Sequence, residues 1–264
     1  MSVQSFDFPH GLIVTRSEGE LAHAGEVDTV FPLASVTKLF ATWAVATVID
    51  EGLMSLSDPL GPEGSTVRHL LSHTSGLAMN SDKVLAAPGQ RRIYSNRGIE
   101  VVTAFAAGHL NLNVDEFLRA KVVEPLGIDS WRYVSSPAYG GSATVRDLAK
   151  FAREVLSPTL LSPALVSEIF TPQFPEVSGI LPGYGKQSPN LWALGFEIRG
   201  EKSPHWTATE APAHLAGHFG QSGSFLWVDR GRDLSTVFAG AKRFSEIHQA
   251  IWPKVNQEIL ENWG

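Results

Sequence analysis

The sequence predicts an α+β fold: an antiparallel β-sheet flanked by helices and built from both chain ends, with an inserted, mostly helical region. Two observations support this prediction. Strand-like segments occur only near the two ends, and helical patterns fill the middle of the chain. With 264 residues and a hydrophobic content of 43%, the chain is long enough to bury a sizeable core.

The N-terminal segment supplies the first strands. Residues 10–14 have the composition of a short strand, and the polar residues 17–20 predict a turn after it. An extended segment then leads from Val27 to Phe31, because the following Pro32 disfavours helical backbone at Phe31. This segment delivers the chain to the start of a helix.

A central, buried helix is predicted to begin near Ser35. Residues 36–49 are apolar or small on every side, which is typical of a helix surrounded by protein. Gly52 is a typical C-terminal stop. The apolar run is shorter than the roughly 20 residues that a membrane span needs.

The remaining middle region is predicted to be mostly helical, with turn-rich residues at 53–64, a connection at 81–89 and one long connection later. Residues 156–190 are rich in Pro and Gly, and we interpret them as this connection, with one short helix inside it. Apolar spacing and capping residues indicate helices at 66–72, 98–108, 113–123, 144–156 and 163–170.

Strands return after the connection. The alternation of Leu194, Phe196 and Ile198 indicates a strand, and the apolar segments 224–229 and 234–240 indicate a hairpin. The chain ends in a predicted helix that begins at Phe244, in which Pro253 should cause a kink or start a second helix.

These elements predict two interlocked domains. Residues 1–34 and 190–264 would form a sheet domain, and residues 35–189 would form the inserted helical domain. The two would meet near Ser35, so the active site is expected at their interface.

Composition excludes several classes of function. The formal net charge is −6 and no segment is dense in Lys and Arg, which argues against nucleic-acid binding. The absence of Cys excludes disulfides, thiol nucleophiles and Cys-ligated zinc.

The N-terminus lacks the apolar core of a signal peptide, so a cytoplasmic location is expected. No cofactor is expected, and the oligomeric state is left open.

Ser35 and Lys38 are the first candidates for chemistry. Side chains three residues apart on a helix lie on one face, with Cβ atoms about 5–6 Å apart. A partly desolvated lysine can act as the base that activates a hydroxyl. The N-terminal end of the helix would also stabilise a developing oxyanion. The alternative is a helix cap beside a solvated surface lysine.

Two further segments supply partners for this pair. Tyr94 and Asn96 offer a phenol that could transfer a proton, if a nearby lysine lowers its pKa, and an amide that could hold a substrate carbonyl. The alternative is a buried tyrosine and a capping Asn. Residues 218–223, His-Phe-Gly-Gln-Ser-Gly, predict a Gly-rich edge strand that a ligand can approach closely, with an ordinary tight turn as the alternative.

In this order, Ser-x-x-Lys, Tyr-x-Asn and a late His-x-Gly resemble the serine β-lactamase and penicillin-binding-protein superfamily. The resemblance is strongest to the branch that includes class C β-lactamases, DD-peptidases and related esterases. Further segments look like hallmarks of that branch: residues 70–77, 88–89, 124–128, 140–141 and 147–151.

The resemblance implies a serine hydrolase that works through an acyl-enzyme. Ser35 would attack a carbonyl, and Lys38 and Tyr94 would act together as general base and then general acid. Backbone N–H groups of Ser35 and Gln221 would form the oxyanion hole. The substrate-binding residues are expected to be Asn96, His218, Phe219, Gly220 and Gln221.

Two departures from the family pattern bear on the substrate. His218 replaces a lysine and would keep a positive charge, whereas Phe219 replaces a hydroxyl-bearing residue that helps to hold the carboxylate of β-lactams. The second change favours a less polar ester or amide. The chain is also short for this branch, so the cleft is expected to be open, and it shows no export signal.

The expected substrates are therefore small esters or amides, with β-lactams as a second class. The alternative function is a penicillin-binding or acyl-sensor protein that is acylated without efficient turnover. Trp192 and Trp206 flank the third motif and could line an apolar acyl pocket, or simply belong to the core. No nucleic-acid partner and no membrane span are expected.

No metal is expected either. The pairs His69/His73 and His214/His218 have the four-residue spacing that permits metal binding on a helix, but neither pair has an evident third ligand. We expect His73 to hold its loop by hydrogen bonds and His218 to line the serine pocket.

Overall fold

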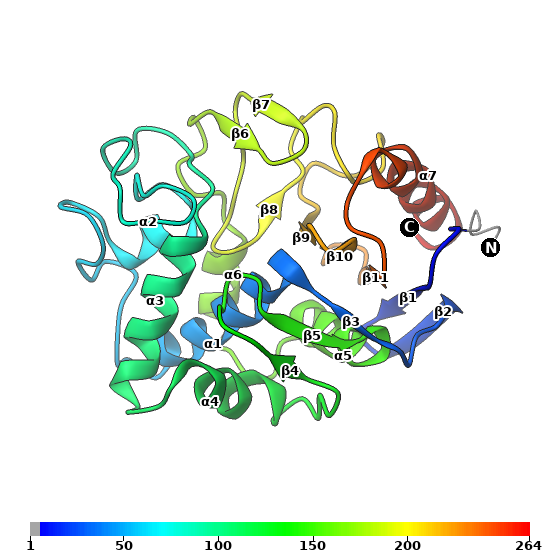
Figure 1. The fold of residues 1–264 in the computed structure, drawn as a ribbon, viewed down its shortest axis with the longest axis horizontal. Coiled ribbons are helices and arrows are strands. Elements are labelled where there is room, and N and C mark those ends of the chain that lie inside the picture. Colours follow the sequence, from blue (N-terminus) through cyan, green and yellow to red (C-terminus); the bar gives the residue numbers. More distant parts are fainter. Residues whose placement is uncertain (1–5) are drawn as a thin grey trace.

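A six-stranded antiparallel sheet dominates the computed structural model, which describes residues 6–264 (Figure 1). The strands lie in the order β2-β1-β11-β10-β9-β8, so the two ends of the chain share one sheet. This confirms the predicted α+β arrangement. The strand bounds are β1 His10–Arg16, β2 Gly19–Gly25, β8 Glu197–Ile198, β9 Ala216–Gly220, β10 Ser224–Asp229 and β11 Leu234–Gly240.

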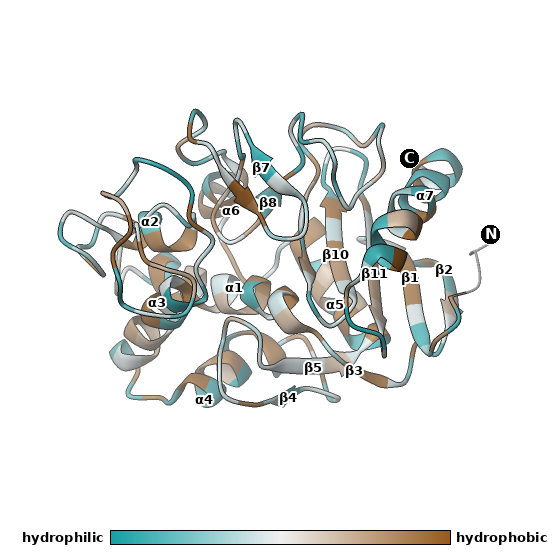
Figure 2. Ribbon diagram, turned by 45° about the horizontal axis from the view of Figure 1, so that its top comes forward, coloured by the Kyte–Doolittle hydropathy of each residue, from teal (hydrophilic) through white to brown (hydrophobic). Residues whose placement is uncertain are grey.

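Helices cover both faces of this sheet. On one face lies α7 (Glu246–Trp263), whose Trp252 packs 5.1 Å from the ring of Phe225. On the other face lies α5 (Val145–Leu156). Neighbouring residues Leu12 and Ile13 of β1 therefore belong to different core clusters. Burial on both sides explains the nearly continuous apolar strands, whose hydrophobic colour is plain along β10 (Figure 2).

The predicted buried helix is α1 (Thr37–Asp50), which runs through the centre of the helical region. Its Phe40 stacks 4.0 Å from the ring of Phe151 in α5. A single 3-10 turn, η1 (Ala34–Val36), precedes the helix and carries Ser35. The other helices are α2 (Val67–Leu71), α3 (Asn96–His109), α4 (Val114–Leu118), the π-helical η2 (Arg119–Val123) and α6 (Pro163–Phe170).

Two small sheets complete the fold. The first has the order β3-β5-β4, with β3 at Val30–Pro32, β5 at Gly141–Thr144 and β4 at Arg132–Tyr133. It anchors the approach to α1, because the backbone N–H of Leu33 donates to the carbonyl of Gly141 at 2.9 Å. The second is a hairpin of β6 (Gly179–Leu181) and β7 (Gly185–Gln187).

Three local predictions need correction. The polar turn at 17–20 leads directly into β2, an exposed edge strand whose backbone pairs with β1 despite its polar side chains. The strand predicted around residues 194–198 shrinks to the two residues of β8. Pro253 lies inside a single helix, α7, and does not start a second one.

The division into a sheet domain and an inserted helical domain stays a prediction. Within the described part of the chain, no helix is long and apolar enough to cross a membrane.

The packing of α5 against α1 generates a stability prediction. Phe151→Ala would remove a ring that stacks on Phe40 and meets Trp43 edge-on, so the free energy of unfolding should fall by about 3–5 kcal/mol. Urea unfolding measures this loss. The control Val134→Ala removes an exposed side chain and should change stability by less than about 0.5 kcal/mol. Equal losses in both variants would contradict the assigned core.

Candidate active site

The predicted motifs meet at a cavity of about 220 Å³. They come from η1, from the start of α3, from β9 and from the turn after β9. Lys38 approaches the cavity from α1 and is fully buried. The predicted site residues that line it are Ser35, Tyr94, Asn96, His218, Phe219 and Gln221.

Lys38 connects three separate parts of the chain. Its Nζ lies 3.1 Å from Ser35 Oγ, 2.6 Å from Asn96 Oδ1 and 2.7 Å from the carbonyl oxygen of Ala138. Burial lowers the pKa of Lys38 well below its ordinary value, and the charge of Glu100 only partly opposes this shift. The solvated surface lysine that sequence left as an alternative is therefore wrong.

Tyr94 lies beside Ser35 and Lys38. The Nζ of Lys38 is 4.8 Å from the centre of the Tyr94 ring, and Tyr94 Oη is 3.3 Å from His218 Nε2. Burial raises the pKa of Tyr94 above its ordinary value, although a hydrogen bond with Ser35 works in the other direction. The sequence-based condition that a lysine charge lowers this pKa is not met, so Tyr94 stays a protonated phenol.

His218 is neutral, contrary to the expectation from sequence. Burial and the nearby Lys38 lower the pKa of His218 to about 3. Its Nδ1 is 2.6 Å from the carbonyl oxygen of Phe219, which accepts and therefore requires the proton on Nδ1. His218 Nε2 is then the acceptor for the Tyr94 hydroxyl. The side chain reaches the site that sequence predicted, but without the positive charge.

The Ser35 segment is tied directly to the turn between β9 and β10. Ser222 Oγ donates to the carbonyl of Pro32, and Ser224 Oγ donates to the carbonyl of Leu33, each at 2.7 Å. A Cβ on Gly220 would come within 2.4 Å of that same Leu33 carbonyl oxygen, so only glycine permits this approach.

These ties bring both expected oxyanion donors to one cavity. Ala34 has a left-handed φ of +42°, which turns the chain sharply into η1 just before Ser35. Ser35 and Gln221 both line the cavity. In β9, only Ala216 and Gly217 pair with β8, so residues 218–220 keep a free edge beside the cavity, as predicted.

The cavity walls are largely apolar. Trp192 lines the cavity, as one of the two sequence interpretations proposed. Trp206 is core instead: its ring lies 6.0 Å from that of Phe219 and its Nε1 donates to Glu197. Sequence reasoning missed four lining residues: Met79, Leu181, Pro182 and Glu197. The Pro/Gly-rich connection was the available signal for two of them, because it folds into the β6–β7 hairpin over the site.

His73 supports Tyr94. Its Nδ1 accepts a hydrogen bond from the backbone N–H of Ser95 at 3.2 Å, and its ring packs 4.7 Å from that of Tyr94. The predicted loop-holding role is therefore confirmed. Within residues 6–264, no group of three or more His, Cys, Asp or Glu side chains is arranged to hold a metal ion.

The comparisons with known proteins agree with this geometry. A family model described as Beta-lactamase matches residues 12–256. A crystal structure of a β-lactamase from Mycobacterium bovis superposes with a TM-score of 0.95 at 43% identity, covering 98% of this chain and 96% of that one. The chain belongs to the β-lactamase family, which confirms the resemblance inferred from the motifs.

More distant relatives match only in part. The D-alanyl-D-alanine-carboxypeptidase/endopeptidase AmpH of Escherichia coli is 26% identical over 165 residues, covering 47% of this chain and 43% of that protein. The matches to this and the other curated relatives cover less than half of each relative's length. An octameric penicillin-binding protein homologue from Pyrococcus abyssi shares the fold, with a TM-score of 0.78 at 17% identity over 96% of this chain and 74% of that one.

The neutral His218 generates a pH prediction. Its pKa is about 3 in the folded protein and about 6.5 when unfolded, so its contribution to stability is present above pH 6.5 and is lost as the pH falls toward 3. The free energy of unfolding, measured with urea, should decline over this range. His218→Gln should flatten the decline, whereas His23→Gln, at an exposed position, should not. An equally steep decline in His218→Gln would sink this assignment.

Proposed function

We propose that this protein is a serine hydrolase that cleaves small, weakly polar esters or amides through an acyl-enzyme at Ser35. One observation carries the proposal: a fully buried Lys38 places its Nζ 3.1 Å from Ser35 Oγ. The family assignment supports a hydrolase, and the local geometry supports these residues as its catalytic machinery.

Lys38 is the base for acylation in this proposal. Because burial lowers its pKa, the amine is readily neutral, with two hydrogens and one lone pair. The two hydrogens are donated to Asn96 Oδ1 and the Ala138 carbonyl oxygen. The lone pair then faces Ser35 Oγ and accepts the hydroxyl proton as the Oγ–carbon bond forms.

Tyr94 acts as an acid in the next step. It remains protonated, so it donates its proton to the departing alkoxide or amine, and the protonated Lys38 restores the phenol's proton. The backbone N–H groups of Ser35 and Gln221 stabilise the oxyanion. In deacylation, neutral Lys38 takes a proton from the attacking water as the water oxygen bonds to the acyl carbon, and it returns that proton to Ser35 Oγ as the acyl–Oγ bond breaks.

The cavity chemistry favours an uncharged acyl group. Met79, Leu181 and Trp192 provide an apolar wall, and Phe219 stands where a hydroxyl would be expected to hold a carboxylate. His218 is neutral, and Lys38 is occupied by its oxygen neighbours. Among the described residues that line the cavity, no free cation is present to bind a substrate carboxylate.

Variants at the proposed catalytic residues test the function. Ser35→Ala should abolish turnover of p-nitrophenyl butyrate, and Lys38→Ala and Tyr94→Phe should each lower kcat by about 10²–10⁴ because acid–base transfer is lost. Wild-type protein should turn over the butyrate ester faster than a chromogenic cephalosporin. The exposed control Lys83→Ala should retain full activity.

Intact-mass spectrometry distinguishes the competing function. A stable adduct of one acyl group on Ser35 without turnover would identify an acyl sensor in place of a hydrolase. Near-normal rates in Lys38→Ala would remove Lys38 from the mechanism.

The proposed base also predicts a pH profile. Activity requires neutral Lys38, so kcat/KM should rise with pH and level off well below the ordinary lysine pKa of 10.5. Initial rates with p-nitrophenyl butyrate, corrected for hydrolysis in buffer, would show this. This rise of kcat/KM with pH should be absent from the residual activity of Lys38→Ala. A midpoint near 10.5 would show that this lysine is solvated and would contradict the proposal.

A further inference from the structure

A second cavity, of about 320 Å³, lies next to the catalytic one. The turn between β6 and β7 borders both: Leu181 and Pro182 line the catalytic cavity, and Gly183 and Tyr184 line the second. The rest of the lining of the second cavity is mostly polar, and the proposed mechanism uses none of it. It includes Arg199, Lys202, His205, Thr207, Thr209 and Gln249.

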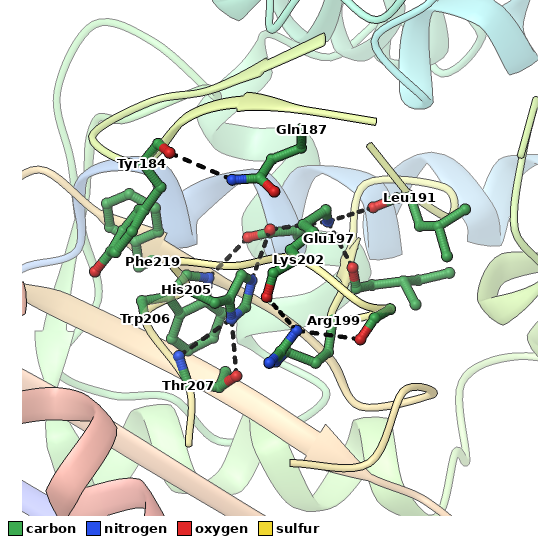
Figure 3. Close-up of polar contacts among 12 residues, drawn as sticks. Tyr184, Gln187, Leu191, Glu197, Arg199, Lys202, His205, Trp206, Thr207 and Phe219 are labelled. Carbon is green, nitrogen blue, oxygen red and sulfur yellow. Dashed lines mark hydrogen bonds and ion pairs between the residues drawn. The ribbon is translucent and has the colours of Figure 1, made fainter. Parts of the chain in front are cut away.

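Lys202 and Glu197 form an ion pair behind this cavity, so their charges balance each other. Glu197 lies 2.9 Å from both Lys202 Nζ and His205 Nε2, and it accepts a hydrogen bond from Trp206 Nε1 at 2.8 Å (Figure 3). Lys202 also donates to the carbonyls of Leu191 and Ile198. All three ammonium hydrogens are therefore occupied, and the charge of Lys202 is balanced by Glu197.

Arg199 is not balanced in this way. It is only 7% exposed, and it donates to the backbone carbonyls of Gly200, Lys202 and Thr209. Figure 3 shows Arg199 and Lys202 side by side. Within residues 6–264, no carboxylate lies within ion-pair distance of it, and its Nε has no hydrogen-bond partner. The charges of Glu201 and Glu197 favour the cation from farther away, but burial outweighs them and lowers the pKa of Arg199. A buried cation without a counter-ion in direct contact is costly. An anion bound in the cavity that Arg199 lines would offset that cost.

Tyr184 provides a second unpartnered polar group from the same lining. Its hydroxyl is buried and has no hydrogen-bond partner among residues 6–264. The centre of its ring lies 6.3 Å from that of His205, which lines the same cavity. A buried hydroxyl without a partner is unusual, because such groups are normally satisfied.

We propose that this second cavity binds a small oxyanion, a carboxylate or phosphate group, with Arg199 as its counter-ion and Tyr184 as an additional donor. A cavity of this size suits a molecule of a few heavy atoms. The bound anion would rest against the β6–β7 turn and thereby steady one wall of the catalytic cavity. The inference concerns binding and does not depend on the proposed hydrolase activity.

Isothermal titration calorimetry on the full-length Ser35→Ala protein tests this site apart from catalysis. Acetate, succinate and inorganic phosphate are titrated separately at constant ionic strength, with chloride as the non-oxyanion control. We expect saturable binding with Kd in the millimolar range for at least one oxyanion and none for chloride. Arg199→Gln should weaken binding about tenfold or more, because a charge-assisted hydrogen bond is lost.

Two further variants control for a purely structural role of Arg199. Tyr184→Phe removes a hydroxyl without a partner, so it should leave stability without ligand unchanged while weakening binding about threefold to tenfold. Arg232→Gln removes an exposed arginine that lines neither cavity and should bind as the parent does.

Each outcome decides the proposal. Binding of carboxylates alone or of phosphate alone supports it and identifies the source of the anion. Binding lost in Arg199→Gln but kept in Tyr184→Phe supports the site and removes Tyr184 from it. If Arg199→Gln does not fold, wild-type binding that Tyr184→Phe weakens still supports it. No saturable binding of any oxyanion, or binding unchanged in both variants, overturns it.

Discussion

The buried amine of Lys38 is the constraint on which the rest of the site depends. Its three oxygen neighbours come from η1, from α3 and from the loop at Ala138, so this one nitrogen contacts three separate parts of the chain. A flexible, solvated lysine could not keep its amine in contact with all three oxygens at once. Because α1 is buried on all sides, the Lys38 side chain is shielded from bulk solvent, and this burial lowers its pKa.

The part of the site that follows β9 is held against the Ser35 segment by hydrogen bonds to backbone carbonyls. Pro32 and Leu33 accept hydrogen bonds from Ser222 of the β9–β10 turn and from Ser224 at the start of β10, and Gly220 allows close contact there. The sheet and the helical region therefore cannot separate without breaking the cavity. His218 is buried in the same place, and burial together with the nearby Lys38 keeps its ring neutral.

The sequence predicted the parts of the site that follow from spacing and order. Ser35, Lys38, Tyr94 and His218 were assigned from motifs, and the buried helix from its apolar pattern. It could not predict which face of a segment meets the cavity, so Trp206 was left open between the cavity wall and the core, and the structure places it in the core. Charge states also escaped prediction, because the pKa of His218 depends on burial that only tertiary packing creates. The β6–β7 hairpin was hidden because Pro and Gly mark turns without indicating what the turns cover.

The β6–β7 hairpin is attached to the body of the protein by few hydrogen bonds. Arg92 forms a bridge with Gly179, and Gln249 donates to the carbonyl of Gly183 at 2.7 Å. The hairpin belongs to neither the six-stranded sheet nor the core around α1, but its Leu181 and Tyr184 pack into the second core cluster, and Leu181 and Pro182 line the cavity beside Ser35. Because Leu181 and Tyr184 are buried in this core, variation that leaves the proposed nucleophile and base in place is confined to hairpin positions such as the exposed Ile180 and the half-buried Pro182. A substitution at Pro182 would thus reshape one wall of the cavity without moving Ser35 or Lys38.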